Sequence, residues 1–184
     1  MRYIAFFLEE ESAQELLKGL LPRLLPSGVE PRYIVFEGKS DLESQLAGKL
    51  RGWRLPETRF VVLRDKDSAD CREVKERLRA LCIAAGKTET LVRIACHEIE
   101  SWYLGDLSAV ERAFEIKGIA KQQGKSKYRD PDKIAAPVQE LRKITRDAYQ
   151  KVSGSRSIGP LLSPEENLSH SFKVFVQGIQ KLLK

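Results

Sequence analysis

The sequence is poor in cysteine and histidine and has no long hydrophobic run. Its 184 residues include three cysteines and two histidines. Cys71, Cys82 and Cys96 are odd in number and show no CxxC spacing, so neither a disulfide framework nor a structural zinc site is expected. No apolar run approaches the ~18 residues of a membrane span, and the short run at residues 4–8 lacks the cleavage site of a signal peptide. We therefore expect a cytoplasmic protein with no membrane segment, in a reducing compartment.

Charge is distributed unevenly along the chain. There are 32 Lys and Arg against 26 Asp and Glu, a formal net charge of +6. Residues 1–114 carry a net charge of −1, whereas residues 115–184 hold 14 basic and 7 acidic side chains, a net charge of +7. Such a basic segment attracts polyanions, because phosphate neutralisation supplies most non-specific affinity for nucleic acid. The alternative is a basic segment that simply stays solvated.

Strand and helix patterns alternate in the first half of the chain. Short apolar runs at residues 3–8, 33–36, 60–63 and 91–95 have the length and composition of strands that are buried on both faces. Apolar residues recur at helical spacing between these runs. The alternation predicts an α/β fold, with a Rossmann-like, mostly parallel four-stranded sheet flanked by helices.

The second half of the chain is predicted to be helical. Apolar residues are spaced for one helix over 138–152 and for an amphipathic C-terminal helix over 168–183, with a loop over 153–164 between them. Residues 118–130 are polar and basic, and we expect this segment to be mobile. The chain is therefore divided into an α/β core, residues 1–106, and a helical, basic C-terminal extension, residues 107–184, packed on that core.

Carboxylates follow three of the four predicted strands. Glu9 follows the first strand, Asp65 and Asp67 the third, and Glu98 and Glu100 the fourth. Because ligand sites in parallel sheets form at the carboxyl ends of the strands, these side chains are expected at one edge. Crowded carboxylates raise one another's pKa, and a divalent cation with oxygen ligands, Mg²⁺ or Mn²⁺, relieves the repulsion. The sequence thus predicts a metal site, with helix capping by the aspartates as the structural alternative.

These motifs resemble a known family. Glu9, the Asp65-x-Asp67 pair, the HEIESWYLGD block and the closing SFKVF are similar to a Toprim-like family of uncharacterised prokaryotic proteins related to Toprim nucleases. The resemblance implies a Toprim fold and a Mg²⁺-dependent nuclease that hydrolyses phosphodiester bonds, with Glu9, Asp65 and Asp67 as catalytic residues. Several members are suspected to act in phage defence, which implies a partner protein. Glu10 and Ala13 depart from the family pattern, which has Gly and Glu there.

Candidate contacts to nucleic acid come from the basic second half of the chain. They lie in the polar segment and in the predicted loop after it: Lys125, Lys127, Arg129, Lys151 and Arg156. Their alternative role is to keep a flexible loop solvated.

Two other functions stay open. The departures at Glu10 and Ala13 fit a nucleic-acid-binding or regulatory subunit that has lost catalysis. A DxD after a hydrophobic strand also occurs in phosphatases, where Asp65 would be the nucleophile acting on small phosphoesters.

Overall fold

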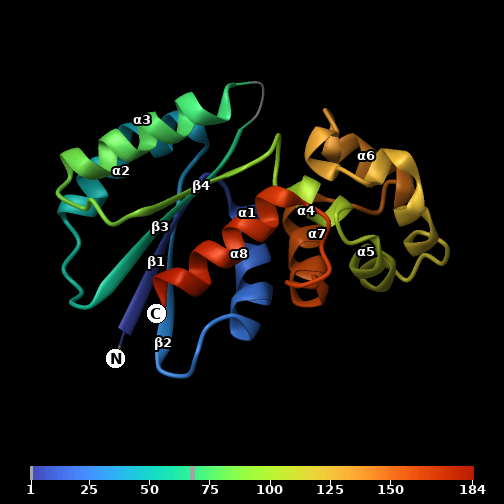
Figure 1. Cartoon of the computed structure of the whole chain (residues 1–184), viewed down its shortest axis with the longest axis horizontal. Coiled ribbons are helices and arrows are strands. Elements are labelled where there is room, and N and C mark those ends of the chain that lie inside the picture. The colour runs from blue at the N-terminus through green and yellow to red at the C-terminus, as the bar shows by residue number, and fades with distance from the viewer. Residues whose placement is uncertain (1, 67–68) are drawn as a thin grey trace.

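The computed structural model of the chain describes residues 2–66 and 69–184 (Figure 1). Four strands form one all-parallel sheet in the order β2-β1-β3-β4. The strands are β1 (Arg2–Leu8), β2 (Val29–Val35), β3 (Thr58–Asp65) and β4 (Leu91–Ala95). Leu8 pairs with Leu63, and Asp65 with Ala95, so the carboxyl ends of β1, β3 and β4 meet at one edge. The predicted α/β fold with a parallel four-stranded sheet is confirmed.

Helices cover both faces of the sheet (Figure 1). The four long helices are α1 (Glu11–Leu20), α2 (Lys39–Arg51), α3 (Cys71–Ala84) and α8 (His170–Leu182). Phe6 and Leu8 of β1 enter the core with α1 and α8, whereas Ala5 and Phe7 enter the core with α2 and α3. Successive side chains of a strand point to opposite faces, so a strand covered on both sides must be apolar throughout.

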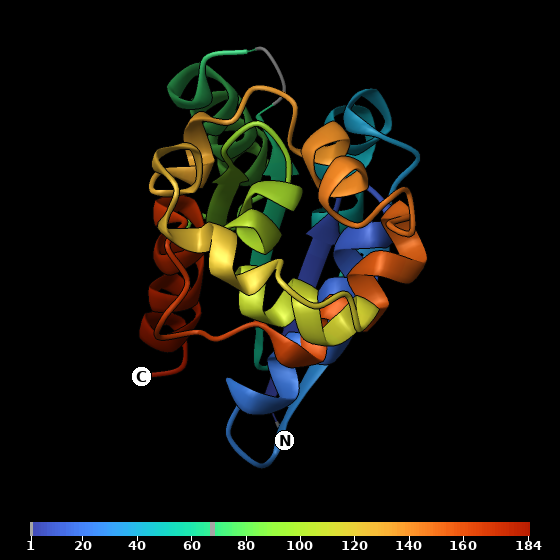
Figure 2. The ribbon, with the colours of Figure 1, turned by 90° about the vertical axis from the view of Figure 1, so that its right-hand side faces the viewer.

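The segment after β4 folds into short helices beyond the carboxyl ends of the strands (Figures 1 and 2). They are α4 (Glu100–Leu104), α5 (Leu107–Phe114), α6 (Pro137–Ile144) and α7 (Lys151–Ile158). Five 3-10 turns accompany the helices in the described chain: Leu21–Arg23, Ala120–Gly124, Ser126–Tyr128, Pro131–Lys133 and Gly159–Leu161. The Trp102 ring lies 5.3 Å from that of Phe172 and 5.1 Å from that of Phe175, which joins α4 to α8 in one core. Within residues 2–66 and 69–184, no helix combines the length and the hydropathy that a membrane crossing requires.

Two local predictions for this segment are wrong. The helix predicted over 138–152 is two helices, because Arg146 and Asp147 adopt φ values of 54° and 64° and turn the chain. The loop predicted over 153–164 is helical as far as Ile158. Residues 118–130 contain two 3-10 turns, with Tyr128 buried in the second, and their mobility stays a prediction. Local spacing missed these features because the contacts that stabilise them come from distant parts of the chain.

Candidate active site at the carboxyl edge of the sheet

Carboxylates from three strand ends converge around Asp65. Glu9 follows β1, Asp65 ends β3, and Glu100 begins α4 shortly after β4. The backbone N–H of Asp65 donates to Glu9 Oε2 at 3.2 Å, and Asp65 Oδ1 accepts from the N–H of Ile99 at 3.1 Å. These two hydrogen bonds connect the ends of β1 and β3 and the entry to α4. The structure therefore brings Glu9, Asp65 and Glu100 to one place.

Asp65 is buried in an environment that disfavours the charged form of its carboxyl group. Only 6 % of it is exposed. Burial raises the pKa of its carboxyl well above the usual range, and the charges of Glu100, Glu9 and Glu10 raise it further. Lys151 acts in the opposite direction but does not offset them. A carboxylate held among carboxylates in a low-dielectric site is costly unless a cation or a proton neutralises it.

Glu100 is fully buried, and only one of its two carboxylate oxygens has a hydrogen-bond partner among the described residues. The Tyr149 O–H donates to Glu100 Oε1 at 2.7 Å, whereas Oε2 has no hydrogen-bond partner among the residues that the structure describes. Burial raises the pKa of Glu100 to about 7, although Lys151 and Tyr149 lower it. Buried polar atoms normally have a partner. A cation at the carboxylate cluster would supply one for Oε2.

Lys151 brings a positive charge to the rim of the cluster. It is the first residue of α7, and its Nζ lies 3.2 and 3.3 Å from the two oxygens of Glu10 and 3.8 Å from Glu98 Oε1. Burial lowers the pKa of Lys151, but the charges of Glu100 and Glu10 outweigh burial and raise it overall. Glu98 therefore contacts the ammonium group, while Glu100 is the one whose charge acts most strongly on Asp65.

A tight turn after β4 separates Glu98 from Glu100. His97 adopts a φ of 60°, a left-handed conformation that is uncommon for a residue other than glycine. The N–H of Glu98 and the hydroxyl of Ser101 both donate to the Cys96 carbonyl, at 3.1 and 2.8 Å. The turn leaves the Ile99 N–H free to bond Asp65, and the helix α4 starts with Glu100 inside the protein.

A buried arginine, Arg64, lies between Glu9 of the cluster and Glu43 of α2. Arg64 precedes Asp65, so its side chain leaves β3 on the opposite face. One of its terminal nitrogens donates to Glu43 Oε1 at 2.5 Å, and its Nε lies 3.7 Å from Glu9 Oε2. The Glu9 carboxylate thus lies beside both the Arg64 guanidinium group and the Asp65 N–H.

The fifth predicted site residue, Asp67, lies outside the described residues. Across residues 2–66 and 69–184, no three His, Cys, Asp or Glu side chains are already grouped as metal ligands would be. Sequence reasoning also missed one contributor, Tyr149. It falls in the apolar spacing that predicted a helix over 138–152, and nothing in its sequence context indicates that its hydroxyl bonds Glu100. The Glu10 departure was visible, but its pairing with Lys151, 141 residues later, was not.

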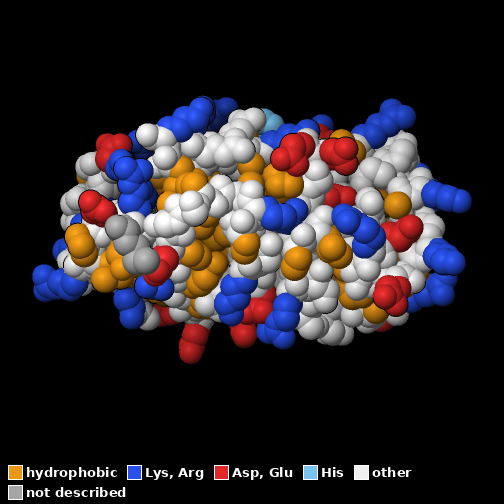
Figure 3. Space-filling model, turned by 90° about the horizontal axis from the view of Figure 1, so that it is seen from below, with side chains coloured by type: hydrophobic (Ala, Val, Ile, Leu, Met, Phe, Trp, Pro, Cys, Tyr) orange, Lys and Arg blue, Asp and Glu red, His pale blue; other side chains and the backbone are white. Residues whose placement is uncertain are grey.

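The predicted nucleic-acid contacts differ in their surroundings. Lys151 lies in the carboxylate cluster, and Arg156 pairs with Glu15 of α1. Lys127 pairs with Glu140, whereas Lys125 and Arg129 are exposed. On the face seen from below, Lys and Arg side chains are interspersed with acidic ones rather than collected in one field (Figure 3).

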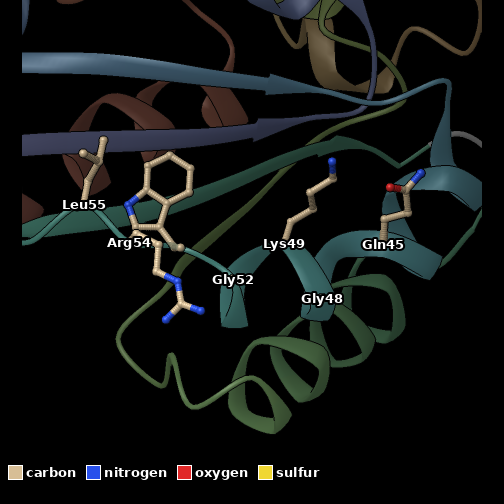
Figure 4. A pocket seen from close by; sticks show the side chains of 7 residues that line it. Gln45, Gly48, Lys49, Gly52, Arg54 and Leu55 are labelled. Carbon is tan, nitrogen blue, oxygen red and sulfur yellow. The ribbon is translucent and has the colours of Figure 1, made fainter.

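A cavity of about 590 Å³ lies at the other end of β3 (Figure 4). It is lined by the C-terminal half of α2 and the connection to β3, with Lys49, Trp53, Arg54 and Leu55 among its residues. These residues precede Thr58 at the start of β3, roughly 20 Å of extended strand away from Asp65. No carboxylate lines this cavity in the described chain, so it is not the site that the sequence predicts.

Comparisons with known proteins cover nearly the whole chain and give a family and a fold, but no activity. Residues 8–180 match a protein family described as a domain of unknown function (DUF4276). No curated protein matches the chain. Among solved structures, the C-terminal region of the Burkholderia pseudomallei OLD protein is similar, with a TM-score of 0.52 and 15 % identity over 98 % of each chain. At this identity the likeness shows a shared fold alone.

Proposed function

The chain belongs to the family described as a domain of unknown function (DUF4276), and we propose that it is a metal-dependent phosphodiesterase of the Toprim type acting on nucleic acid. One observation carries the proposal. Asp65 and Glu100 are both buried, the charge of Glu100 raises the pKa of Asp65, and Glu100 Oε2 has no hydrogen-bond partner among the described residues. Burying these carboxylates together costs free energy, and a bound divalent cation would offset that cost. The similarity of fold to the C-terminal region of the OLD protein supports the proposal at the level of fold.

The donor set fits a hard divalent cation. Asp65 and Glu100 offer carboxylate oxygens from two neighbouring strand ends, and these are the ligands that Mg²⁺ and Mn²⁺ prefer. Asp67 joins them on the sequence resemblance alone. A bound Mg²⁺ would polarise the phosphoryl group and lower the pKa of a coordinated water.

The other residues have separate roles in this proposal. Glu9 is the general base: its carboxylate accepts a hydrogen bond from the Asp65 N–H, lies 3.7 Å from Arg64 Nε and retains 16 % side-chain exposure. Lys151 neutralises Glu10 and Glu98, so the charge that Glu10 adds in place of glycine is offset. Tyr149 holds Glu100 in position through its hydroxyl.

The setting is inferred from the sequence resemblance. We place the enzyme in defence against foreign DNA, together with a partner protein. This part of the proposal predicts that nicking by the isolated chain is weaker than nicking in the presence of that partner.

Calorimetric titration with Mg²⁺ and Mn²⁺, beside a plasmid-nicking assay on the same preparations, tests the proposal. Asp65→Asn should lose both metal binding and nicking. Glu89→Gln is the matched control, because Glu89 is exposed near the start of β4, at the opposite edge of the sheet. Metal binding that survives in Asp65→Asn would refute the metal site.

A catalytically reduced nucleic-acid-binding subunit is the second candidate. The ammonium group of Lys151 within the cluster favours it, because a built-in cation already neutralises two of the carboxylates. It predicts nucleic-acid binding that is unchanged by EDTA and no nicking with either metal. Metal-dependent nicking that is lost in Asp65→Asn would exclude this candidate.

A further inference from the structure

A second, basic cavity lies in the C-terminal segment. Its volume is about 470 Å³, within the range of sites that enclose a small molecule or one unit of a polymer. Its lining includes three lysines, Lys127, Lys133 and Lys143, and two carboxylates, Asp130 and Glu140, which pair with Lys133 and Lys127. Between them, Ile134 and Ala135 contribute an apolar part of the wall. The lining therefore combines one lysine without an ion pair to a described residue, Lys143, with an apolar surface.

The segment around this cavity carries most of the protein's excess charge. Residues 117–146 contain nine basic and three acidic side chains. All three acids are engaged within the protein: Glu140 pairs with Lys127, Asp130 pairs with Lys133 at 2.9 Å, and Asp132 accepts hydrogen bonds from the start of α8. Apart from Lys127 and Lys133, the basic side chains of this segment form no ion pair with a residue that the structure describes.

Three of these cations lie together at the end of α6. Lys143 lines the cavity, and Arg142 and Arg146 are exposed next to it in the sequence. None of the three forms an ion pair with any residue that the structure describes. Arg142 and Lys143 belong to the last turn of α6 and Arg146 follows it, and cations without an ion pair attract polyanion phosphates.

We propose that this cavity binds single-stranded nucleic acid. A base would lie against Ile134 and Ala135, and the flanking phosphates would contact Lys143, Arg142 and Arg146. A single strand fits better than a duplex, because the paired and stacked bases of a duplex cannot enter a concave apolar surface. The inference rests on the proposed function and supplies its substrate-binding surface.

The path of the chain connects this surface to the carboxylate cluster. Helix α6 ends at Ile144, and five residues later Tyr149 donates its hydrogen bond to Glu100. Lys151 follows and contacts Glu10 and Glu98. A strand bound at the cavity would thus be held by the same segment that orders the site.

Fluorescence anisotropy with a labelled oligonucleotide of about 12 nucleotides tests this inference. Measurements in EDTA prevent cleavage, and a series from about 50 to 200 mM salt reports the number of phosphate contacts. Lys143→Glu should weaken single-strand binding about tenfold and reduce the salt slope by about 1. Lys181→Glu is the matched control: it makes the same charge change at an exposed, unpaired lysine near the end of α8 and should leave binding nearly unchanged.

Three results would overturn the inference. They are equal effects of Lys143→Glu and Lys181→Glu, tighter binding of duplex than of single strand, and no binding by the wild type. Asp65→Asn separates this inference from the proposed function, since it should abolish nicking and keep single-strand binding. Metal-dependent nicking by the wild type, with unchanged binding in Lys143→Glu, would refute the cavity and leave the phosphodiesterase proposal intact.

Discussion

Replacing Glu100 with glutamine should change how the stability of the metal-free protein depends on pH. Glu100 is fully buried, and burial raises the pKa of its carboxyl from an ordinary 4.5 to about 7. Below about pH 4.5 the group is protonated in both the folded and the unfolded chain and costs nothing. Its cost grows as the pH rises toward 7 and is complete above 7, because the folded state then holds a charge that burial disfavours.

The size of the effect follows from the pKa difference. A rise from 4.5 to about 7 corresponds to about 3 kcal/mol, since each pKa unit is worth about 1.4 kcal/mol. Glutamine has the same shape, carries no charge and can still accept the Tyr149 hydrogen bond. Relative to wild type, the free energy of unfolding of Glu100→Gln should therefore increase by about 2–3 kcal/mol between pH 4.5 and pH 8. Any constant cost of burying the amide cancels in this comparison.

Urea unfolding at several pH values in EDTA measures this difference. Glu140→Gln is the control of opposite sign: burial alone would raise the pKa of Glu140, but hydrogen bonds from Lys127 and Tyr128 lower it overall. That variant should lose stability relative to wild type as the pH rises. A stability difference between Glu100→Gln and wild type that stays constant from pH 4.5 to 8 would refute the reasoning. At pH 8, Mg²⁺ should stabilise the wild type more than Glu100→Gln, as expected of a ligand that binds the folded state.

Three further changes probe the surroundings of the cluster. Tyr149→Phe leaves Glu100 without its hydrogen bond and should cost about 1–3 kcal/mol in urea unfolding at pH 8, with a smaller loss at pH 4.5; equal losses would contradict the role of the charge. Lys151→Met removes the cation of the cluster and should strengthen Mg²⁺ binding about tenfold by calorimetry; weaker binding would show that the ammonium group assists the metal. Gly154→Ala places a Cβ 2.4 Å from Tyr149 Cε2 and should lower the Tm by an amount equivalent to about 1–3 kcal/mol, whereas Gly48→Ala, with open space around its Cβ, should not lower it.

The parallel four-stranded sheet and a set of carboxylates at its carboxyl edge were predictable from the sequence. Strands buried on both faces must be apolar throughout, so they appear as uninterrupted runs. Parallel strands end at the same edge, so the carboxylates that follow these runs were expected to meet there: Glu9, Asp65, Asp67, Glu98 and Glu100. Both inferences depend on local composition and on a general rule of sheet geometry, and neither requires knowledge of a distant contact.

The tertiary structure decided how the carboxylates differ from one another. The left-handed turn at His97 directs Glu98 to the rim and Glu100 into the core, a choice that the spacing of two residues left open. Tyr149 and Lys151 reach the cluster only because the chain breaks after α6 and α7 packs beside α1. Their partners lie 49 to 141 residues away, and no helical or strand periodicity encodes a contact over that separation. Burial and pKa depend on these contacts, so the chemistry of each carboxylate is a property of the folded protein.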